Sequence, residues 1–455
     1  MKMLLEKIIA GTWNRLFARR REARFGGGSL DLGYRADDGH VTRGRVTLTS
    51  RERMRHVVVL GKTGSGKSYF LRYMSQQDVE KGRGFIYFDL HGDATPFLLR
   101  TINARERREH RHLSDRVILI DPADPIMSIG LNPLEQDAPD FVRIAEVAEI
   151  LKRHWGLDHF GARTDELLRN ALYVLSANHL TLVELTPLLA DSGFRAACLE
   201  KVPNAEVREY FDLRYDTASE AMQATMREPI LNKTSAFTAD PKFRHIVGQP
   251  QSSFSFRRAM DEGSWVIVNL AKGRLGAQAL TLGSLIFTMV KNALFARTGE
   301  RLCTLYCDEV QNFVAQASEI ETVLSEARKT NTGLVAAHQF MDQLPAEMRA
   351  ALLSVGTHVF FQLSSADAVH VAQALGGGRS LTERLKNLPQ RFAVVKTGSE
   401  EWAELRVPTL DEPRVDITDL VNRVRYTRGR VRAHIEREIC ERQKRMRRSA
   451  EEDLR

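Results

Sequence analysis

The chain has 455 residues, of which 43% are hydrophobic and 27% are charged, ordinary values for a globular protein with a sizeable core. Its four cysteines are too scattered for a disulfide framework or a zinc site, and we expect buried, reduced thiols. The formal charge of +8 is concentrated at the ends, with +5 in residues 1–24, +6 in residues 421–455 and −3 in the body. Such basic arms favour a polyanion, either nucleic acid or an anionic membrane surface, although a solvated helix face explains each arm equally well.

Residues 1–25 form a predicted basic amphipathic helix. Leu4, Ile8 and Trp13 fall on one side of it, and Arg19–Arg21 follow. Docking against the protein's own body explains this stripe somewhat better than contact with anionic lipid does. The segment lacks the features of a signal peptide, and no run in the chain approaches the roughly 18–20 apolar residues of a membrane span. We therefore expect a cytoplasmic protein, with peripheral contact to the inner membrane as the alternative.

The next part of the chain alternates strand and helix patterns. After a short strand-rich stretch to about residue 50, apolar runs predict strands at 56–60, 85–90 and 117–120, with a helix at 68–80. This alternation predicts a parallel sheet covered by helices.

Residues 140–258 differ in character, because apolar residues recur there at helical spacing with few β-branched runs. We interpret this stretch as an all-α domain inserted into the α/β body. Strand patterns return afterwards, at 265–270, 303–307, 334–337, 358–363 and 392–396. The predicted domains are the amino-terminal helix 1–25, the two parts of the α/β domain at 26–139 and 259–420, the insertion 140–258 and an Arg-rich carboxyl-terminal helix or tail 421–455.

One segment carries a phosphate-binding pattern. Residues 61–68 match G-x-x-x-x-G-K-[ST] in full, between an apolar strand and a helix. The glycines let backbone N–H groups close around phosphates, and the following helix adds its dipole. We expect Lys67 to reach the β- and γ-phosphates of ATP and the Ser68 hydroxyl to ligate Mg²⁺. The predicted nucleotide-binding residues are Gly61, Lys62, Thr63, Gly64, Ser65, Gly66, Lys67 and Ser68.

An acid pair directly follows the predicted strand at 303–307 and forms the second half of the predicted site. Asp308 would hold Mg²⁺ through water, and Glu309 would polarise the attacking water. Because surface Asp-Glu pairs are common, this assignment depends on the P-loop. 

Two further positions are hypotheses. Gln339 ends the next apolar strand, where it would touch the γ-phosphate; the alternative is an ordinary polar strand end. Arg328 lies on a predicted helix after the acid pair, where it would stabilise charge in a neighbouring subunit's site; the alternative is a surface arginine. Asp89, His91 and Asp93 close the strand at 85–90, and we expect them to position Mg²⁺ or water rather than form a separate metal site.

In order, these motifs resemble the HerA–FtsK superfamily of hexameric P-loop motors. The segments that carry the resemblance are HVVVLGKTGSGKS, FIYFDLHGD, VILIDPADP, LYCDEVQNF and LSEARKTNTGLVAAHQF, within residues 40–410. They are most similar to the DNA-binding coupling ATPases of type IV secretion and conjugation. The resemblance implies an α/β, RecA-like P-loop NTPase fold with a mostly parallel central sheet, to which the residue patterns add an inserted all-α domain and basic helical termini. It also implies ATP and Mg²⁺ as cofactors, a Mg²⁺-associated Asp308, a catalytic Glu309, a sensor at Gln339 and a trans-acting Arg328.

The function implied by the resemblance is ATP-driven translocation of DNA by a homohexameric ring toward a conjugation channel, with the all-α insertion facing the relaxosome. DNA would be held through its phosphates, independently of sequence. Coupling proteins usually carry an amino-terminal transmembrane region, whereas this chain has a basic helix. The alternatives are therefore a soluble HerA-like helicase or translocase of DNA repair or defence, and an ATPase that powers protein secretion without DNA. The tail is expected to contact DNA or an acidic partner through Arg442, Lys444, Arg445, Arg447 and Arg448.

Overall fold

The computed structural model describes residues 28–37, 39–135, 139–155, 157, 161–314, 317–341, 344–398 and 401–453. The amphipathic helix predicted for residues 1–25 lies outside the described residues. The chain forms two compact units, and each is described by itself. The first consists of Met1–Ile118, Arg258–Val268 and Arg297–Val421, and the second of Leu119–Arg257, Asn269–Ala296 and Asn422–Arg455.

The first unit is built on a mixed sheet of eleven strands in the order β2-β1-β12-β11-β10-β3-β9-β8-β4-β7-β5. Their bounds are β1 Leu30–Asp37, β2 His40–Leu48, β3 Val57–Leu60, β4 Gly84–Asp89, β5 Val117–Ile120, β7 Trp265–Asn269, β8 Cys303–Cys307, β9 Thr332–His338, β10 Thr357–Phe360, β11 Phe392–Thr397 and β12 Ala403–Arg406.

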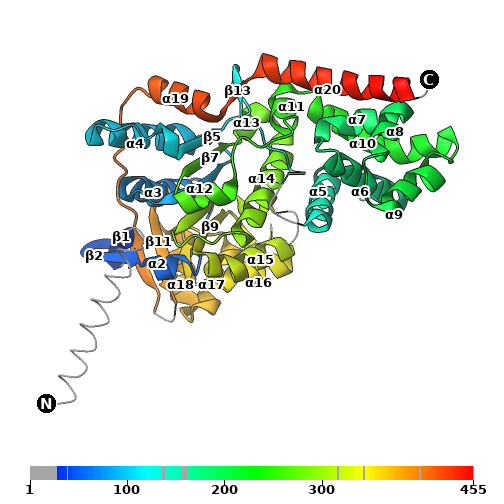
Figure 1. Cartoon of the computed structure of the whole chain (residues 1–455). Helices are drawn as coiled ribbons and strands as arrows, with labels where there is room; N and C mark the ends of the chain where they lie inside the picture. Colours follow the sequence, from blue (N-terminus) through cyan, green and yellow to red (C-terminus); the bar gives the residue numbers. More distant parts are fainter. Residues whose placement is uncertain are drawn as a thin grey trace, which may run out of the picture. The chain divides into compact units, whose positions relative to one another are not determined.

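The centre of this sheet is parallel, as the strand–helix alternation predicts. Strand β3 pairs in parallel with β10 and β9, β9 with β8, and β8 with β4. All residues of β3, β4, β8 and β9 are buried, which explains why these strands are continuous apolar runs in the sequence. Antiparallel pairs add β11, β12, β1 and β2, so blue amino-terminal strands join orange carboxyl-terminal ones (Figure 1).

Helix α3 (Lys67–Lys81) follows β3 and has ends fixed by two glycines. Gly66 precedes its first residue with φ +121°, and Gly82 ends it in the left-handed conformation, where its amide donates to the carbonyls of Asp78 and Val79. The other helices of the first unit are α2 Ser50–Arg53, α4 Ala94–Glu109, η1 Ser114–Arg116, η4 Val310–Asn312, α15 Ala317–Glu326, η5 Ala327–Thr330, α16 Ala346–Leu353, α17 Ser365–Ala374 and α18 Gly378–Asn387. Two more, α12 Phe256–Glu262 and α19 Thr418–Arg428, span the boundaries between the units.

The second unit is mostly helical. Its helices are α5 Asp140–Trp155, α6 Ala162–Ala177, η2 Leu182–Glu184, α7 Leu185–Ala190, α8 Ser192–Leu199, α9 Ala205–Glu209, the π-helix η3 Tyr210–Tyr215, α10 Glu220–Thr238, α11 Pro241–Val247, α13 Lys272–Leu275, α14 Gln278–Phe295 and α20 Arg432–Asp453. The short strands β6 Met127–Ser128 and β13 Arg430–Val431 pair with each other.

Helices α14 and α20 belong to the same unit as the helices of residues 140–258. Helix α20 packs against α8 and buries Ile435 and Ile439. Its Arg442 donates to the buried carboxylate of Glu184 at 2.8 Å, and its Glu436 accepts from Arg244 at 3.0 Å. The carboxyl-terminal helix is thus held by apolar and ionic contacts within the helical unit, while the predicted domain boundaries remain a prediction.

Two smaller findings bear on the sequence-based expectations. None of the helices in the described part of the chain is long and apolar enough to cross a membrane. Cys198, Cys303 and Cys307 are buried free thiols as expected, but Cys440 is exposed, because it lies on a face of α20 that turns away from the buried Ile435 and Ile439.

Candidate functional site

The P-loop of residues 61–68 connects β3 to α3, and its glycines are needed for two different reasons. A Cβ on Gly61 would lie 2.7 Å from the Cβ of Phe361 and 2.8 Å from the Ser65 hydroxyl. Gly64 and Gly66 have φ angles of +77° and +121°, which side-chain-bearing residues rarely adopt. Close packing therefore fixes the start of the loop, and backbone conformation fixes its turn.

Lys67 is the first residue of α3, and its ammonium group points back into the loop. Its Nζ donates to the carbonyl of Gly61 at 2.6 Å and to that of Lys62 at 3.2 Å. Burial lowers the pKa of Lys67, while the nearby carboxylates of Glu309 and Asp308 raise it. A buried cation at this position is suited to bind the phosphates of a nucleotide.

Ser68 and Asp308 meet directly. The Ser68 hydroxyl donates to Asp308 Oδ2 at 2.6 Å. Burial raises the pKa of Asp308, and so does the charge of Glu309, whereas Ser68, His91 and Lys67 oppose the rise. The other carboxylate oxygen, Oδ1, is buried and has no hydrogen-bond partner among the described residues. A hydroxyl and a carboxylate that keeps one buried oxygen unpartnered are a donor set that fits Mg²⁺.

Glu309 is buried beside this pair and has a left-handed backbone with φ +59°, an uncommon conformation for a residue with a side chain. Its Oε2 accepts from Gln311 Nε2 at 2.7 Å, and its backbone carbonyl accepts from Asn312 Nδ2 at 3.2 Å. The Gln311 contact orients the carboxylate, as a group that aligns a water molecule requires, and the Asn312 contact holds the backbone of Glu309.

Gln339 directly follows β9 and lies against the P-loop. Its Oε1 accepts from the Thr63 hydroxyl at 3.1 Å, although 276 residues separate the two. Arg328 is exposed in η5, and no hydrogen bond or ion pair joins it to the P-loop within the described residues. The structure thus brings together the P-loop, the acid pair and Gln339, but not Arg328.

Asp89 mainly organises its own loop. Its Oδ1 accepts from the Gly92 amide at 2.9 Å, and its Oδ2 accepts from the amide and hydroxyl of Thr95, both at 2.7 Å. His91 lies close enough to Asp308 to lower the pKa of that carboxyl. Among the described residues no group of three or more His, Cys, Asp and Glu side chains could hold a metal.

Sequence reasoning missed the segment that covers the P-loop from the other side. Arg391 donates its backbone N–H to the Ser65 carbonyl at 3.0 Å, and Gln390 Nε2 donates to the Gly64 carbonyl at 3.1 Å. No motif marks these residues, and Gln390 lies 326 residues beyond Gly64, so only the fold reveals the contact.

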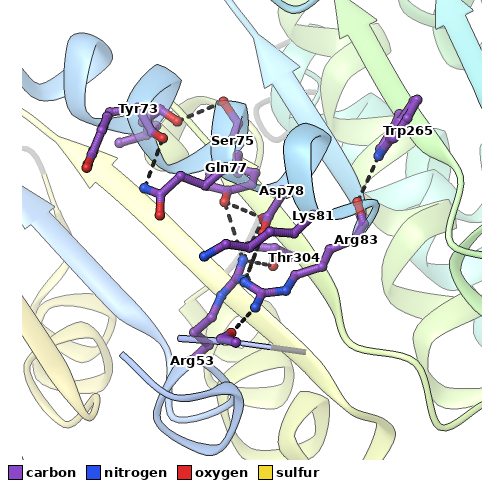
Figure 2. Close-up of polar contacts among 12 residues, drawn as sticks. Arg53, Tyr73, Ser75, Gln77, Asp78, Lys81, Arg83, Trp265 and Thr304 are labelled. Carbon is purple, nitrogen blue, oxygen red and sulfur yellow. Dashed lines mark hydrogen bonds and ion pairs between the residues drawn. The ribbon is translucent and has the colours of Figure 1, made fainter. Parts of the chain in front are cut away.

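A buried ionic cluster fixes the far end of α3 (Figure 2). The Arg53 guanidinium donates to both oxygens of Asp78, at 2.8 and 2.6 Å, and to the Thr304 hydroxyl at 2.6 Å. The Tyr306 hydroxyl donates to Asp78 at 2.7 Å. Because Thr304 and Tyr306 lie on β8, the cluster connects the helix that follows the P-loop with the strand that leads to Asp308.

Comparisons with known proteins agree with this geometry. Residues 39–289 match the family model described as the central domain of helicase HerA. A search of curated protein sequences finds no match.

Three solved structures illustrate the fold. The plasmid coupling protein TrwB with the non-hydrolysable ATP analogue ADPNP has a TM-score of 0.57 at 18% identity, over 86% of this chain and 98% of that one. TrwB with ADP and Mg²⁺ gives 0.55 at 16% identity, over 86% and 98%. VirB4 of Thermoanaerobacter pseudethanolicus gives 0.55 at 16% identity, over 85% and 98%. At these identities the matches show a shared RecA-like P-loop ATPase fold.

Proposed function

The chain belongs to the family of the helicase HerA central domain, in the HerA–FtsK superfamily of P-loop ATPases, and on this basis we propose that it is an ATP-hydrolysing, ring-forming motor that translocates DNA. The observation that carries the proposal is the contact between Ser68 of the P-loop and Asp308, with Glu309 buried beside it. A phosphate-binding loop, a metal-binding carboxylate and a carboxylate that can align water are the parts that ATP hydrolysis requires.

The proposed roles follow from the positions of the side chains. Backbone N–H groups of residues 61–68 would surround the phosphates, and Lys67 would exchange its carbonyl partners for phosphate oxygens. Ser68 and Asp308 would hold Mg²⁺, which neutralises charge on the β- and γ-phosphates when it is bound. Glu309 would orient the attacking water and accept its proton.

Gln339 and Arg328 would connect hydrolysis to movement. Gln339 accepts a hydrogen bond from Thr63. Loss of the γ-phosphate beside Gln339 would therefore change the positions of both the end of β9 and the P-loop. Arg328 is exposed on its own subunit, as an arginine that serves a neighbour's site in a ring must be. The role of Arg328 requires a ring, which we propose to be a homohexamer.

The substrate we propose is DNA, bound through its phosphates independently of sequence. The basic arm at 421–455 supplies positive charge, with Lys444 and Arg445 exposed on α20. The fold shared with TrwB, a plasmid coupling protein, supports delivery of DNA toward a conjugation or type IV secretion channel, where relaxosome or channel proteins would be partners. The match to the helicase HerA central domain favours a second candidate, a HerA-like translocase of DNA repair or defence.

ATP turnover of the purified chain, measured with and without single- and double-stranded DNA, tests the proposal. We expect turnover to require Mg²⁺ and to rise with DNA, and we expect Glu309→Gln to lower it by about 10²–10⁴-fold while ATP still binds. An ATP turnover rate that neither form of DNA changes would instead favour an ATPase that powers protein secretion. A Glu309→Gln variant with normal turnover would refute the catalytic assignment.

A further inference from the structure

The two sides of the P-loop are chemically different. In the order β11-β10-β3-β9-β8, the loop after β3 has β9 and β8 on one side and β10 and β11 on the other. The first side presents Gln339, Asp308 and Glu309. The second side presents Gln390 and Arg391, which directly precede β11 and bond to the loop backbone.

The backbone of Arg391 packs tightly against the P-loop. Its backbone N–H donates to the Ser65 carbonyl at 3.0 Å, and its own carbonyl accepts from the Val407 N–H at 2.9 Å. A Cβ on Gly66 would lie 3.3 Å from both the N and the Cα of Arg391. Arg391 also has a left-handed backbone with φ +69°, and such a conformation persists only where the surrounding contacts impose it. The fold therefore holds this arginine at one place beside the phosphate-binding loop.

The Arg391 side chain lies by Tyr69, the residue after Ser68. The guanidinium carbon is 5.5 Å from the centre of the Tyr69 ring, and Nη1 donates to the Thr409 hydroxyl at 3.4 Å. The Tyr69 hydroxyl in turn accepts from the Leu410 N–H. Both side chains are half-buried, so each keeps part of its surface accessible to a ligand. An aromatic ring and a planar guanidinium are surfaces on which a purine base stacks.

We propose that Tyr69 and Arg391 bind the ribose and base of the nucleotide, which makes Arg391 a residue that determines affinity for a nucleoside triphosphate over its bare triphosphate chain. This inference rests on the proposed function, in which the γ-phosphate faces Gln339, Asp308 and Glu309. A nucleotide held in that direction across residues 61–68 extends its other end toward β10 and β11, where Tyr69 and Arg391 lie. The guanidinium is also able to donate to acceptor atoms of the base.

The experiment compares the binding of Mg²⁺-ATP and of Mg²⁺-tripolyphosphate by calorimetry. Arg391→Gly removes the guanidinium and retains a backbone suited to φ +69°. We expect this variant to raise the Kd for ATP about tenfold or more, equivalent to roughly 1.4 kcal/mol, and to change the Kd for tripolyphosphate less than twofold. Arg391→Lys should lose most of the same affinity, because lysine lacks the planar group.

Arg406→Ala is the matched control, since Arg406 also covers an aromatic ring, that of Phe392, and lies on β12 rather than against the P-loop. It should bind both ligands as the wild type does. Equal weakening of ATP and tripolyphosphate by Arg391→Gly, or no weakening of either, would overturn the inference. A wild-type chain that binds neither ligand would instead refute the proposed function, so the two failures are distinguishable.

Discussion

The Ser68 hydroxyl donates a 2.6 Å hydrogen bond to the Asp308 carboxylate across 240 residues of sequence. The sheet accounts for this contact, because β3 and β8 both pair in parallel with β9 and end at the same edge. Ser68, in the first turn of α3, therefore meets Asp308, the residue that follows β8. Burial of Asp308 Oδ1 without a partner among the described residues leaves one carboxylate oxygen available for a cation.

We predict that Ser68→Ala and Asp308→Asn raise the Mg²⁺ concentration needed for half-maximal ATP turnover, by roughly tenfold or more, because each removes one oxygen that would hold the ion. Magnesium titrations of turnover at saturating ATP measure this. Ser75→Ala is the control on the same helix, since its hydroxyl bonds the Leu71 carbonyl and lies away from the loop. Unchanged magnesium dependence in both site variants would remove Mg²⁺ binding from this pair.

We predict that the buried ion pair of Arg53 and Asp78 contributes strongly to the stability of the first unit (Figure 2). Both side chains are at most 2% exposed, so Asp78→Asn leaves the Arg53 guanidinium without its counter-charge in the interior. We expect a loss of about 3–5 kcal/mol in the free energy of unfolding, measured by urea denaturation. The double variant Arg53→Met with Asp78→Asn should cost less than the sum of the single variants, because the two residues form one unit.

The exposed pair of Lys386 and Glu383 on α18 provides the comparison. Lys386→Ala should change the free energy of unfolding by less than about 1 kcal/mol, since the pair remains in contact with water. A similar small effect for Asp78→Asn would show that the cluster does not anchor α3.

The sequence predicts the centre of the sheet well for a physical reason. Buried parallel strands such as β3 are uninterrupted apolar runs, and the P-loop has a fixed glycine pattern. Contacts that depend only on tertiary folding leave no such mark. Three contacts join segments through charge or packing rather than through a periodic pattern. They are the Arg53–Asp78 pair, the contact of Arg391 with the P-loop and the contact of Arg442 with Glu184 inside the helical unit. The short strand β12 was not predicted, because its four residues, AELR, include no β-branched or aromatic side chain.

We predict that the first unit loses stability in acid because of the buried His338. It ends β9 with a side chain that is 1% exposed, and burial lowers its pKa to about 4. Because the folded-state pKa lies below the ordinary value of about 6.5, the unfolded chain binds the proton first as the pH falls. The stability linked to His338 is thus complete above pH 6.5 and is lost between about pH 6.5 and 4, in an amount of about 3 kcal/mol.

The variant His338→Gln does not titrate, so its free energy of unfolding should fall less steeply with pH across that window than the wild type's. Urea denaturation at several pH values between 7 and 4.5 measures the two slopes. The half-buried histidine His154, whose pKa burial also lowers to about 4, lies in the second unit and should leave this difference unaffected. Parallel slopes for wild type and His338→Gln would contradict the prediction.

Arg328 is tested by mixing subunits. We expect Arg328→Ala to reduce ATP turnover by roughly 10³-fold or more if its guanidinium serves a neighbour's site. The variant subunit keeps its own Lys67, Asp308 and Glu309, so mixing it with Glu309→Gln subunits should restore part of the turnover at sites that combine an intact acid with an intact arginine. Variant subunits that lose turnover without affecting wild-type neighbours would show that Arg328 does not act in trans.

The carboxyl-terminal basic arm is best tested by point substitutions. Deleting residues 421–455 is expected to weaken DNA binding and flatten its salt dependence, but it also removes Ile435 and Ile439 from the core of the helical unit. The double variant Lys444→Gln with Arg445→Gln changes exposed residues only. If both contact phosphates of duplex DNA, the slope of log K against log salt concentration should become shallower by about 2. Arg442→Gln should instead lower the unfolding midpoint, because it leaves the buried Glu184 without its cation. An unchanged salt slope in the double variant, with DNA-stimulated turnover intact, would assign the arm to protein contacts or to solvation.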